Sequence, residues 1–387
     1  MSSRDWSVPE TDVLGAIYDA CRSDRRAVLA TIVRVEGSAY RRPGTKMLID
    51  SDGDGVGSLT AGCLEDEVRS LATAVLESGR SRIERFDLSG DDDVWGLGIG
   101  CNGVIDILLE PLTDALEPAL SAFADGESGT VVTVLDSETD AFDRGDRAYY
   151  HEGAGEFREL VGTWPDDVTT RLEDAVSSLA TTGDAETVTV DVAGSAVTLF
   201  CDGIVAPPEL VVFGSGHDVA PVVELATLAD FRVTVVGFRG AVTTGEKFPD
   251  ADRVVSASPA EVRDVLELDE RTYTVVMTHN FVDDRIALEE LVQSPVPYIG
   301  LMGPHKRFDE MLEAFDEEDR AFTRAELSSV YTPIGLDLGG GAPYQIAMSI
   351  VSELLAVHND RSPGHLRDRD GALHDRIDVA LGDPSQQ

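Results

Sequence analysis

A glycine-rich turn in the second half of the chain is the first feature that could hold a charged ligand. The segment LVVFGSGHDVA, residues 210–220, leads from a run of apolar residues into an expected helix. Gly214 permits a tight turn, and Gly216 lets a phosphate approach the backbone N–H groups where the helix begins. Because the pattern stands between a strand and a helix, it predicts a site for a phosphate-bearing ligand.

Two histidines and an arginine are expected around this turn. His217 follows it directly, where a neutral imidazole could donate a hydrogen bond or bind a metal, with capping or packing as the alternative. His279 follows another expected strand, at the edge where parallel sheets bind ligands. Gly237 stands where NAD-binding proteins carry an acidic residue for the ribose, whereas Arg239 could meet a 2′-phosphate or be a surface charge. The sequence therefore predicts nucleotide binding without selecting NAD.

Lysine is rare in this chain, which draws attention to each position that carries it. The only lysines are Lys46, Lys247 and Lys306. Lys306 precedes Arg307 in YIGLMGPHKR, an expected strand, glycine turn and helix start. In so acidic a protein this pair indicates contact with an anion, and a solvated helix start is the alternative.

The first half of the chain holds three loops with unusual composition. GSAYRRPGTKM (37–47) contains Arg41, GCLEDE (62–67) contains Cys63 and Glu65, and GLGIGCNG (96–103) contains Cys101. A thiolate is stabilised at a helix N-terminus, and soft thiolate ligands suit a metal–dithiolene group. Each cysteine alone could be a buried loop residue, but the set together favours a binding site for a soft, anionic ligand.

The order of expected elements predicts two domains of different class. Residues 206–358 alternate between Val-rich strands and helices, which is typical of a Rossmann-like, doubly wound parallel sheet. Residues 1–205 predict a mixed α+β domain with an acidic, β-rich middle segment. The polar residues 359–387 are expected to be a disordered tail. The fold class is therefore α/β.

Composition limits the classes of partner and the compartment. The chain has 387 residues, 72 Asp plus Glu against 31 Lys plus Arg, and a net charge of −41. Scattered acid with little lysine is typical of proteins adapted to high salt, and it excludes duplex nucleic acid as a partner. No apolar run reaches membrane length, residues 1–10 do not resemble a signal peptide, and no C-x-x-C motif occurs. We expect a cytoplasmic protein without a membrane contact, in which Cys21 and Cys201 fill the core.

Several motifs together resemble the XdhC/CoxI family, the accessory factors of xanthine dehydrogenase and carbon monoxide dehydrogenase. GSAYRRPGTKM, GCLEDEV and GLGIGCNG resemble its N-terminal domain. LVVFGSGHDVA, VVMTHNFVDD, YIGLMGPHKR and IGLDLGGGAPYQIAMSIVSELLA resemble its Rossmann domain. The resemblance covers nearly the whole chain outside the tail and the acidic middle segment. In contrast to the family, Gly237 replaces an acidic residue, and the acidic pair usual after Pro343 is absent.

This resemblance implies a maturation factor rather than an enzyme with turnover. Such a factor binds molybdenum cofactor (molybdopterin), protects it while its sulfur is installed, and helps insert it into a molybdenum hydroxylase apo-enzyme. A cysteine desulfurase is a second candidate partner, and a homodimer is expected. The resemblance places Arg41, Cys63, Glu65 and Cys101 near the cofactor, and Gly214, Gly216 and His217 in a dinucleotide-like pocket.

Two other functions remain open from the sequence. An NAD(P)-dependent oxidoreductase would explain the glycine turn, but Gly237 and the lack of a clear hydride-transfer acid or base weigh against it. A nucleotide-sensing scaffold that binds a partner enzyme is the third interpretation. NAD(P) or another nucleotide thus stays a candidate ligand beside the pterin cofactor.

Overall fold

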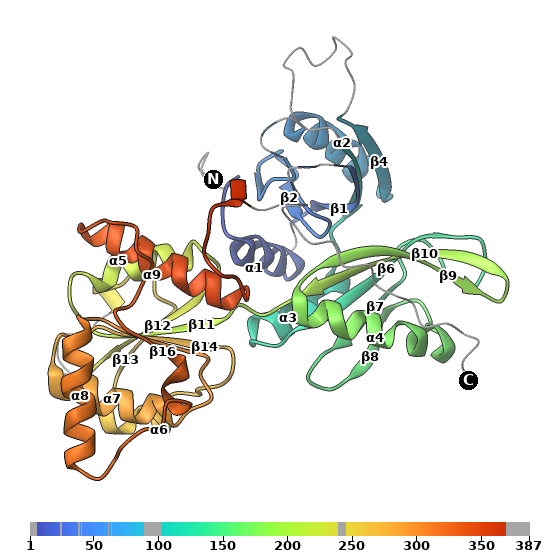
Figure 1. Cartoon of the computed structure of the whole chain (residues 1–387). Coiled ribbons are helices and arrows are strands. Elements are labelled where there is room, and N and C mark those ends of the chain that lie inside the picture. Colours follow the sequence, from blue (N-terminus) through green and yellow to red (C-terminus); the bar gives the residue numbers. More distant parts are fainter. Residues whose placement is uncertain are drawn as a thin grey trace. The chain divides into compact units, whose positions relative to one another are not determined.

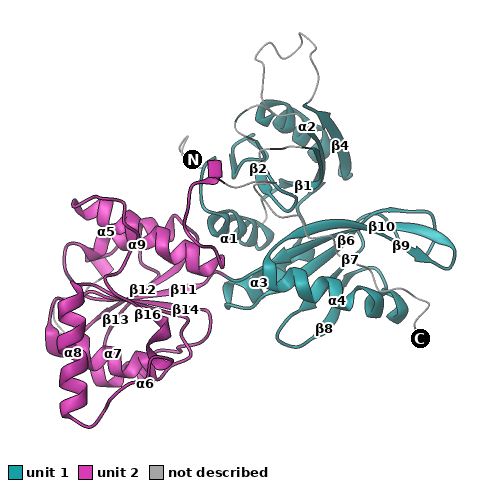
Figure 2. Ribbon diagram, in the orientation of Figure 1, with its two compact units in different colours: residues 1–206, 376–387 teal, residues 207–375 magenta. Residues whose placement is uncertain are grey.

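The computed structural model describes residues 6–23, 25–37, 39, 41–60, 62, 64–88, 103–238 and 245–368. The chain divides into two compact units, residues 1–206 with 376–387 and residues 207–375, shown in two colours in Figure 2. Figure 1 labels their helices and strands.

Unit 1 contains two antiparallel sheets of five strands each. Sheet A has the order β3-β2-β1-β5-β4, and sheet B has the order β8-β7-β6-β10-β9. The strands of sheet A are β1 (Ala27–Gly37), β2 (Lys46–Asp50), β3 (Gly55–Val56), β4 (Arg82–Asp87) and β5 (Gly103–Pro111). Those of sheet B are β6 (Gly129–Ser137), β7 (Arg147–His151), β8 (Glu156–Val161), β9 (Ala185–Val192) and β10 (Ser195–Ile204). The helices are α1 (Glu10–Cys21), α2 (Glu65–Ser78), α3 (Glu117–Ala124) and α4 (Asp166–Thr182).

Side chains alternate between the two faces of each strand, and their contacts show which elements pack on each side of the sheets in unit 1. Val28, Ala30 and Ile32 of β1 pack with α2 on one face of sheet A. Leu29 and Val33, on the opposite face, join apolar side chains of sheet B. The far face of sheet B packs against α4. The two sheets therefore face each other, with α2 and α4 on the outside.

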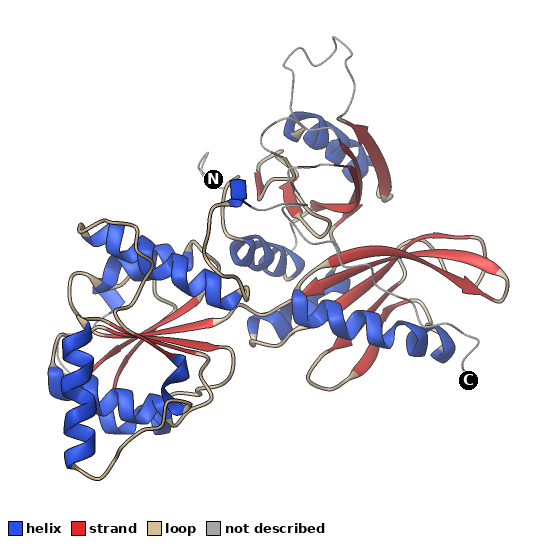
Figure 3. Ribbon diagram, viewed as in Figure 1, coloured by secondary structure: helices blue, strands red, loops and turns tan. Residues whose placement is uncertain are grey.

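Unit 2 is a parallel six-stranded sheet of order β13-β12-β11-β14-β15-β16. Its strands are β11 (Glu209–Phe213), β12 (Arg232–Gly237), β13 (Arg253–Ser256), β14 (Thr272–Val276), β15 (Tyr298–Leu301) and β16 (Val330–Tyr331). Its helices are α5 (Val219–Thr227), α6 (Val262–Val265), α7 (Phe281–Val292), α8 (His305–Glu317) and α9 (Pro343–His358). Helices α5 and α9 cover one face of the sheet, and α6, α7 and α8 cover the other (Figure 3).

This architecture confirms the predicted α/β class, with a mixed α+β unit followed by a doubly wound parallel sheet. Cys201 is buried in the core of sheet B, as expected, whereas Cys21 is only half-buried. Strands β13 and β16 were not predicted, because they are short and lie toward the two edges of the sheet. Within the described ranges, no helix is long and apolar enough to span a membrane.

Candidate functional site

The loops of unit 1 that the sequence singled out start from one end of sheet A. Gly37 ends β1 and pairs with Gly103, the first residue of β5. Asp87, at the end of β4, pairs with Val104, and Leu88 N donates to Gly103 O at 2.9 Å. Gly37, Leu88 and Gly103 therefore lie side by side at this end of the sheet, although they are far apart along the chain.

A third loop, residues 57–64, comes to the same end from β3. A Cβ atom on Gly57 would lie 2.7 Å from Lys46 O, so this backbone passes directly over the start of β2. Arg41 Nη2 donates to Ser58 Oγ at 3.3 Å, which joins the first loop to the third. Helix α2 begins where this third loop ends, and the apolar side chains of Leu59 and Leu64 anchor the loop in the core under α2.

Glu65 closes the third loop from within. Its carboxylate accepts hydrogen bonds from Thr60 N at 2.9 Å, from Thr60 Oγ1 at 2.7 Å and from Leu64 N at 3.1 Å. Both carboxylate oxygens accept hydrogen bonds from the loop itself, so Glu65 stabilises the conformation of the loop that Arg41 contacts. Cys63, between these residues in sequence, and Cys101 lie outside the described residues.

The glycine turn of unit 2 lies at the switch point of the sheet. Strands β11 and β14 are neighbours there, and the chain leaves β11 toward β12 on one side and β14 toward β15 on the other. A Cβ on Gly214 would lie 2.7 Å from Met277 O, so the turn after β11 touches the end of β14. This is the position where doubly wound sheets bind ligands.

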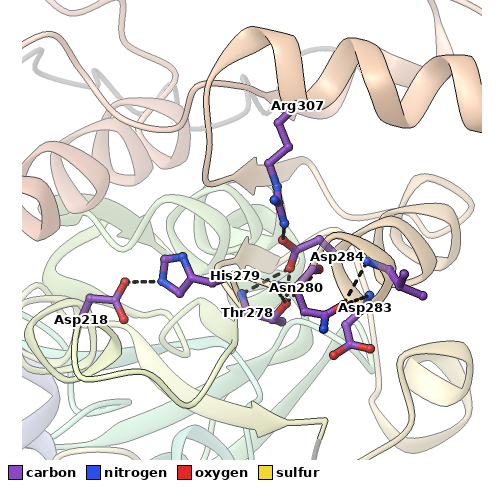
Figure 4. Close-up of polar contacts among 8 residues, drawn as sticks. Asp218, Thr278, His279, Asn280, Asp283, Asp284 and Arg307 are labelled. Atoms are coloured by element: carbon purple, nitrogen blue, oxygen red, sulfur yellow. Dashed lines mark hydrogen bonds and ion pairs between the residues drawn. The ribbon is translucent and has the colours of Figure 1, made fainter.

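Asp218 and His279 form an ion-pair-type contact across this switch point (Figure 4). His279 Nε2 lies 2.7 Å from Asp218 Oδ2, and the ring is about half exposed. The backbone of His279 has φ of 60°, a conformation that residues other than Gly rarely adopt. His217 is exposed and precedes the helix start, so it neither caps nor packs. Among the described residues no three potential ligands gather around a metal position.

A buried carboxylate fixes the turn that carries His279. Asp284, 1 % exposed, accepts hydrogen bonds from Thr278 Oγ1 and Thr278 N, and its Oδ2 lies 2.5 Å from Arg307 Nη2 (Figure 4). The N-cap of α7 is Asn280, which accepts from the next two backbone amides. The cap is therefore Asn280, although Asp283 and Asp284 are the acidic residues at the start of this helix. Asn280 stands at the N-cap position, from which its side-chain oxygen reaches the amides of Val282 and Asp283, whereas Asp283 and Asp284 lie inside the first turn.

Lys306 and Lys247 have different surroundings in the structure. Lys306 is 84 % exposed and pairs with Glu310 at 3.4 Å in its own helix. Lys247, in a half-buried position, donates to Ser215 O in the glycine turn instead. In the sequence, only the rarity of lysine indicated that Lys247 could matter. Arg239 lies outside the described residues.

The residues around the turn do not fit a dinucleotide such as NAD. A Cβ on Gly216 would clash with Asp218 Oδ1, so a carboxylate covers the glycine that a diphosphate must approach. Gly237, at the end of β12, offers no acceptor side chain for a ribose. A diphosphate would have to displace the Asp218 carboxylate from Gly216, so this geometry disfavours the oxidoreductase interpretation.

Comparison with known proteins identifies the family. Residues 20–87 match the XdhC and CoxI family, and residues 210–354 match the XdhC Rossmann domain. A Bacillus subtilis protein, named as a probable subunit of xanthine dehydrogenase, is 31% identical over 345 residues, which cover 88% of this chain and 96% of that protein. The chain belongs to the XdhC and CoxI family.

Two further relatives agree with this assignment. The crystal structure of a xanthine dehydrogenase from Bacillus halodurans has a TM-score of 0.72 at 28% identity, over 91% of this chain and 96% of that one. The molybdenum cofactor insertion chaperone PaoD of Escherichia coli is 32% identical over 125 residues, 30% of this chain and 38% of its own. The predicted family resemblance is thus confirmed for this XdhC/CoxI protein.

Proposed function

We propose that this XdhC/CoxI protein is an accessory factor that binds molybdenum cofactor and helps insert its sulfurated form into a xanthine dehydrogenase-type hydroxylase. The observation that carries the proposal is that Gly37, Gly103 and the Arg41–Ser58 contact, which belong to or adjoin the three motifs, lie at one end of sheet A. The chain also matches the XdhC and CoxI family along most of its length. Relatives named for xanthine dehydrogenase and for cofactor insertion support it.

The chemistry of the donor groups suits this cofactor. Molybdopterin carries an anionic phosphate, and the Arg41 guanidinium beside Ser58 offers a planar cation for it. The thiols of Cys63 and Cys101 are soft ligands of the kind that bind transition metals. Glu65 keeps the Cys63 loop closed through Thr60 and Leu64. When bound, the cofactor supplies the metal and its sulfur chemistry, and these residues hold and shield it.

Unit 2 is proposed to hold a separate ligand of its own at the switch point, either a pterin or the base of a nucleotide. Gly214, Gly216, His217 and His279 line this position, and the Asp218 carboxylate favours a group that donates hydrogen bonds, as pterin N–H groups do. Arg239 and Lys306 stay predictions as outer cationic contacts. A cytoplasmic location, a homodimer and a cysteine desulfurase partner belong to the same proposal.

The test is to purify the full chain from a host that makes molybdopterin and to measure oxidised-pterin fluorescence and molybdenum content. We expect both in comparable amounts on the wild type, and loss of both in the Cys63→Ser/Cys101→Ser double variant. Cys21→Ser is the matched control, because Cys21 lies on α1, away from the loops. A wild type without pterin and molybdenum, or a double variant that retains both, would contradict the proposal.

A further inference from the structure

Two buried ion pairs cross the boundary between the sheets of unit 1. Lys46 Nζ, from β2, lies 2.9 Å from Asp202 Oδ2 of β10. Arg147 Nη2, from β7, lies 2.6 Å from Glu110 Oε1 of β5. All four side chains are at most about one-tenth exposed, and a cavity of about 30 Å³ lies between them. Burial raises the pKa of Asp202, although the Lys46 ammonium acts in the opposite direction.

Buried ion pairs of this kind define geometry more than they add stability. A protein in which apolar side chains of similar size replace such a pair is often equally stable, whereas removal of one partner leaves an uncompensated buried charge. Each pair here joins one strand of sheet A to one strand of sheet B, which fixes how the two faces meet. The pairs differ in what else they contact, and that difference indicates a separate part for Lys46 and Asp202.

Lys46 and Asp202 also hold the loop that carries Arg41. Lys46 Nζ donates to Gly44 O at 2.8 Å, within that loop. A Cβ on Gly44 would lie 3.0 Å from Ala185 Cβ and 3.2 Å from Asp202 Oδ1, so the loop backbone rests directly on sheet B. Gly44 has φ of 90°, which a residue with a side chain would adopt only with strain.

A second contact, two residues before Gly44, holds the same loop. Arg42 Nη1 lies 3.6 Å from Asp184 Oδ1, beside the start of β9. Asp184, Ala185 and Asp202 thus form a seat on sheet B for residues 42–46. In the other pair, Arg147 Nε donates to Thr133 Oγ1 within the sheets, and neither Arg147 nor Glu110 is hydrogen-bonded to the described residues of the loop.

We propose that Asp202 is a positioning residue of the candidate cofactor site: through Lys46 and Gly44 it fixes the loop that presents Arg41. This inference rests on the proposed function. It gives sheet B, whose strands carry none of the motif residues, a part in cofactor binding. Arg41 directly precedes residues 42–46, which the seat fixes, so the position of Arg41 at its contact with Ser58 depends on the seat.

The test compares Asp202→Asn with Glu110→Gln. Each isosteric change neutralises the carboxylate of one buried ion pair and leaves its basic partner in place. We expect Asp202→Asn to retain about tenfold less cofactor, the usual effect of losing a residue that orients a ligand. Glu110→Gln should retain it within about twofold, although both variants lose stability. Amide hydrogen exchange should rise at Gly44 and Thr45 in Asp202→Asn alone.

A double-mutant cycle separates positioning from general destabilisation. If Asp202 acts through the loop, Asp202→Asn should cost little more cofactor once Arg41→Gln has been introduced. Equal losses in Asp202→Asn and Glu110→Gln, or full retention in both, would overturn this inference while the proposed function stands. A wild type without cofactor would overturn the proposed function itself. Should Asp202→Asn fail to fold, Asp184→Ala applies the same test at the exposed part of the seat.

Discussion

The Asp284 network in unit 2 gives the sharpest prediction on stability. Asp284→Ala removes the partner of Arg307, whose Nε is buried without a hydrogen-bond partner among the described residues. It also removes the acceptor for the Thr278 hydroxyl and amide. Breaking a buried ion pair from one side costs about 3–5 kcal/mol. Because the Arg307 side chain is 24% exposed, water offsets part of that cost, and we expect about 3 kcal/mol.

The assay is thermal and denaturant unfolding at fixed salt. For a domain of this size, a loss of about 3 kcal/mol lowers Tm by about 6–12 °C. Asp284→Asn keeps an acceptor for Thr278 and should lose about half as much. The neighbouring carboxylate supplies the control, since Asp283→Ala changes a half-exposed side chain and should stay within about 0.5 kcal/mol. A loss below about 1 kcal/mol for Asp284→Ala, or equal losses at both positions, would refute the reasoning.

Two further predictions concern thiol reactivity and the glycine turn. Burial raises the pKa of Cys21 to about 11 and that of Cys201 to about 12, so iodoacetamide at pH 8 should leave both unmodified by mass spectrometry. Labelling of Cys21 should then rise as the pH approaches 11, and rapid labelling of either thiol at pH 8 would contradict this. Gly214→Ala places a Cβ against Met277 O and should destabilise unit 2 by about 1–3 kcal/mol. Gly245→Ala, which meets nothing within 4 Å, is its control, and equal unfolding midpoints would show that the close approach is unimportant.

Sequence patterns predicted the helices and strands in which apolar side chains recur regularly, or without interruption, over several residues. The run Leu210–Phe213 is apolar without interruption because β11 is buried on both faces, so it was recognised with its turn. β16 has only two residues, both half-buried, and β13 is half-exposed at the edge, so neither shows a period that could be detected.

The candidate site was predictable only where its residues are neighbours in sequence. The contact of His279 with Asp218 spans 61 positions, and that of Lys46 with Asp202 spans 156, so neither follows from local patterns. Lys306 drew attention because it adjoins Arg307, but its side chain extends into solvent. Its rarity pointed equally to Lys46 and Lys247, which the structure places in contacts with the loops. Only the tertiary fold could decide among the three.

The pairing of Asp87 with Val104, and of Leu88 with Gly103, has a consequence for how relatives of this protein can diverge. Leu88 and Gly103 are hydrogen-bonded to each other, so the length of the sequence between them can change at small entropic cost and without shifting the strand register. Relatives can therefore differ in the length and composition of this segment and keep the same strands. Grafting the corresponding segment from a relative should change what this end of sheet A recognises while leaving the scaffold intact.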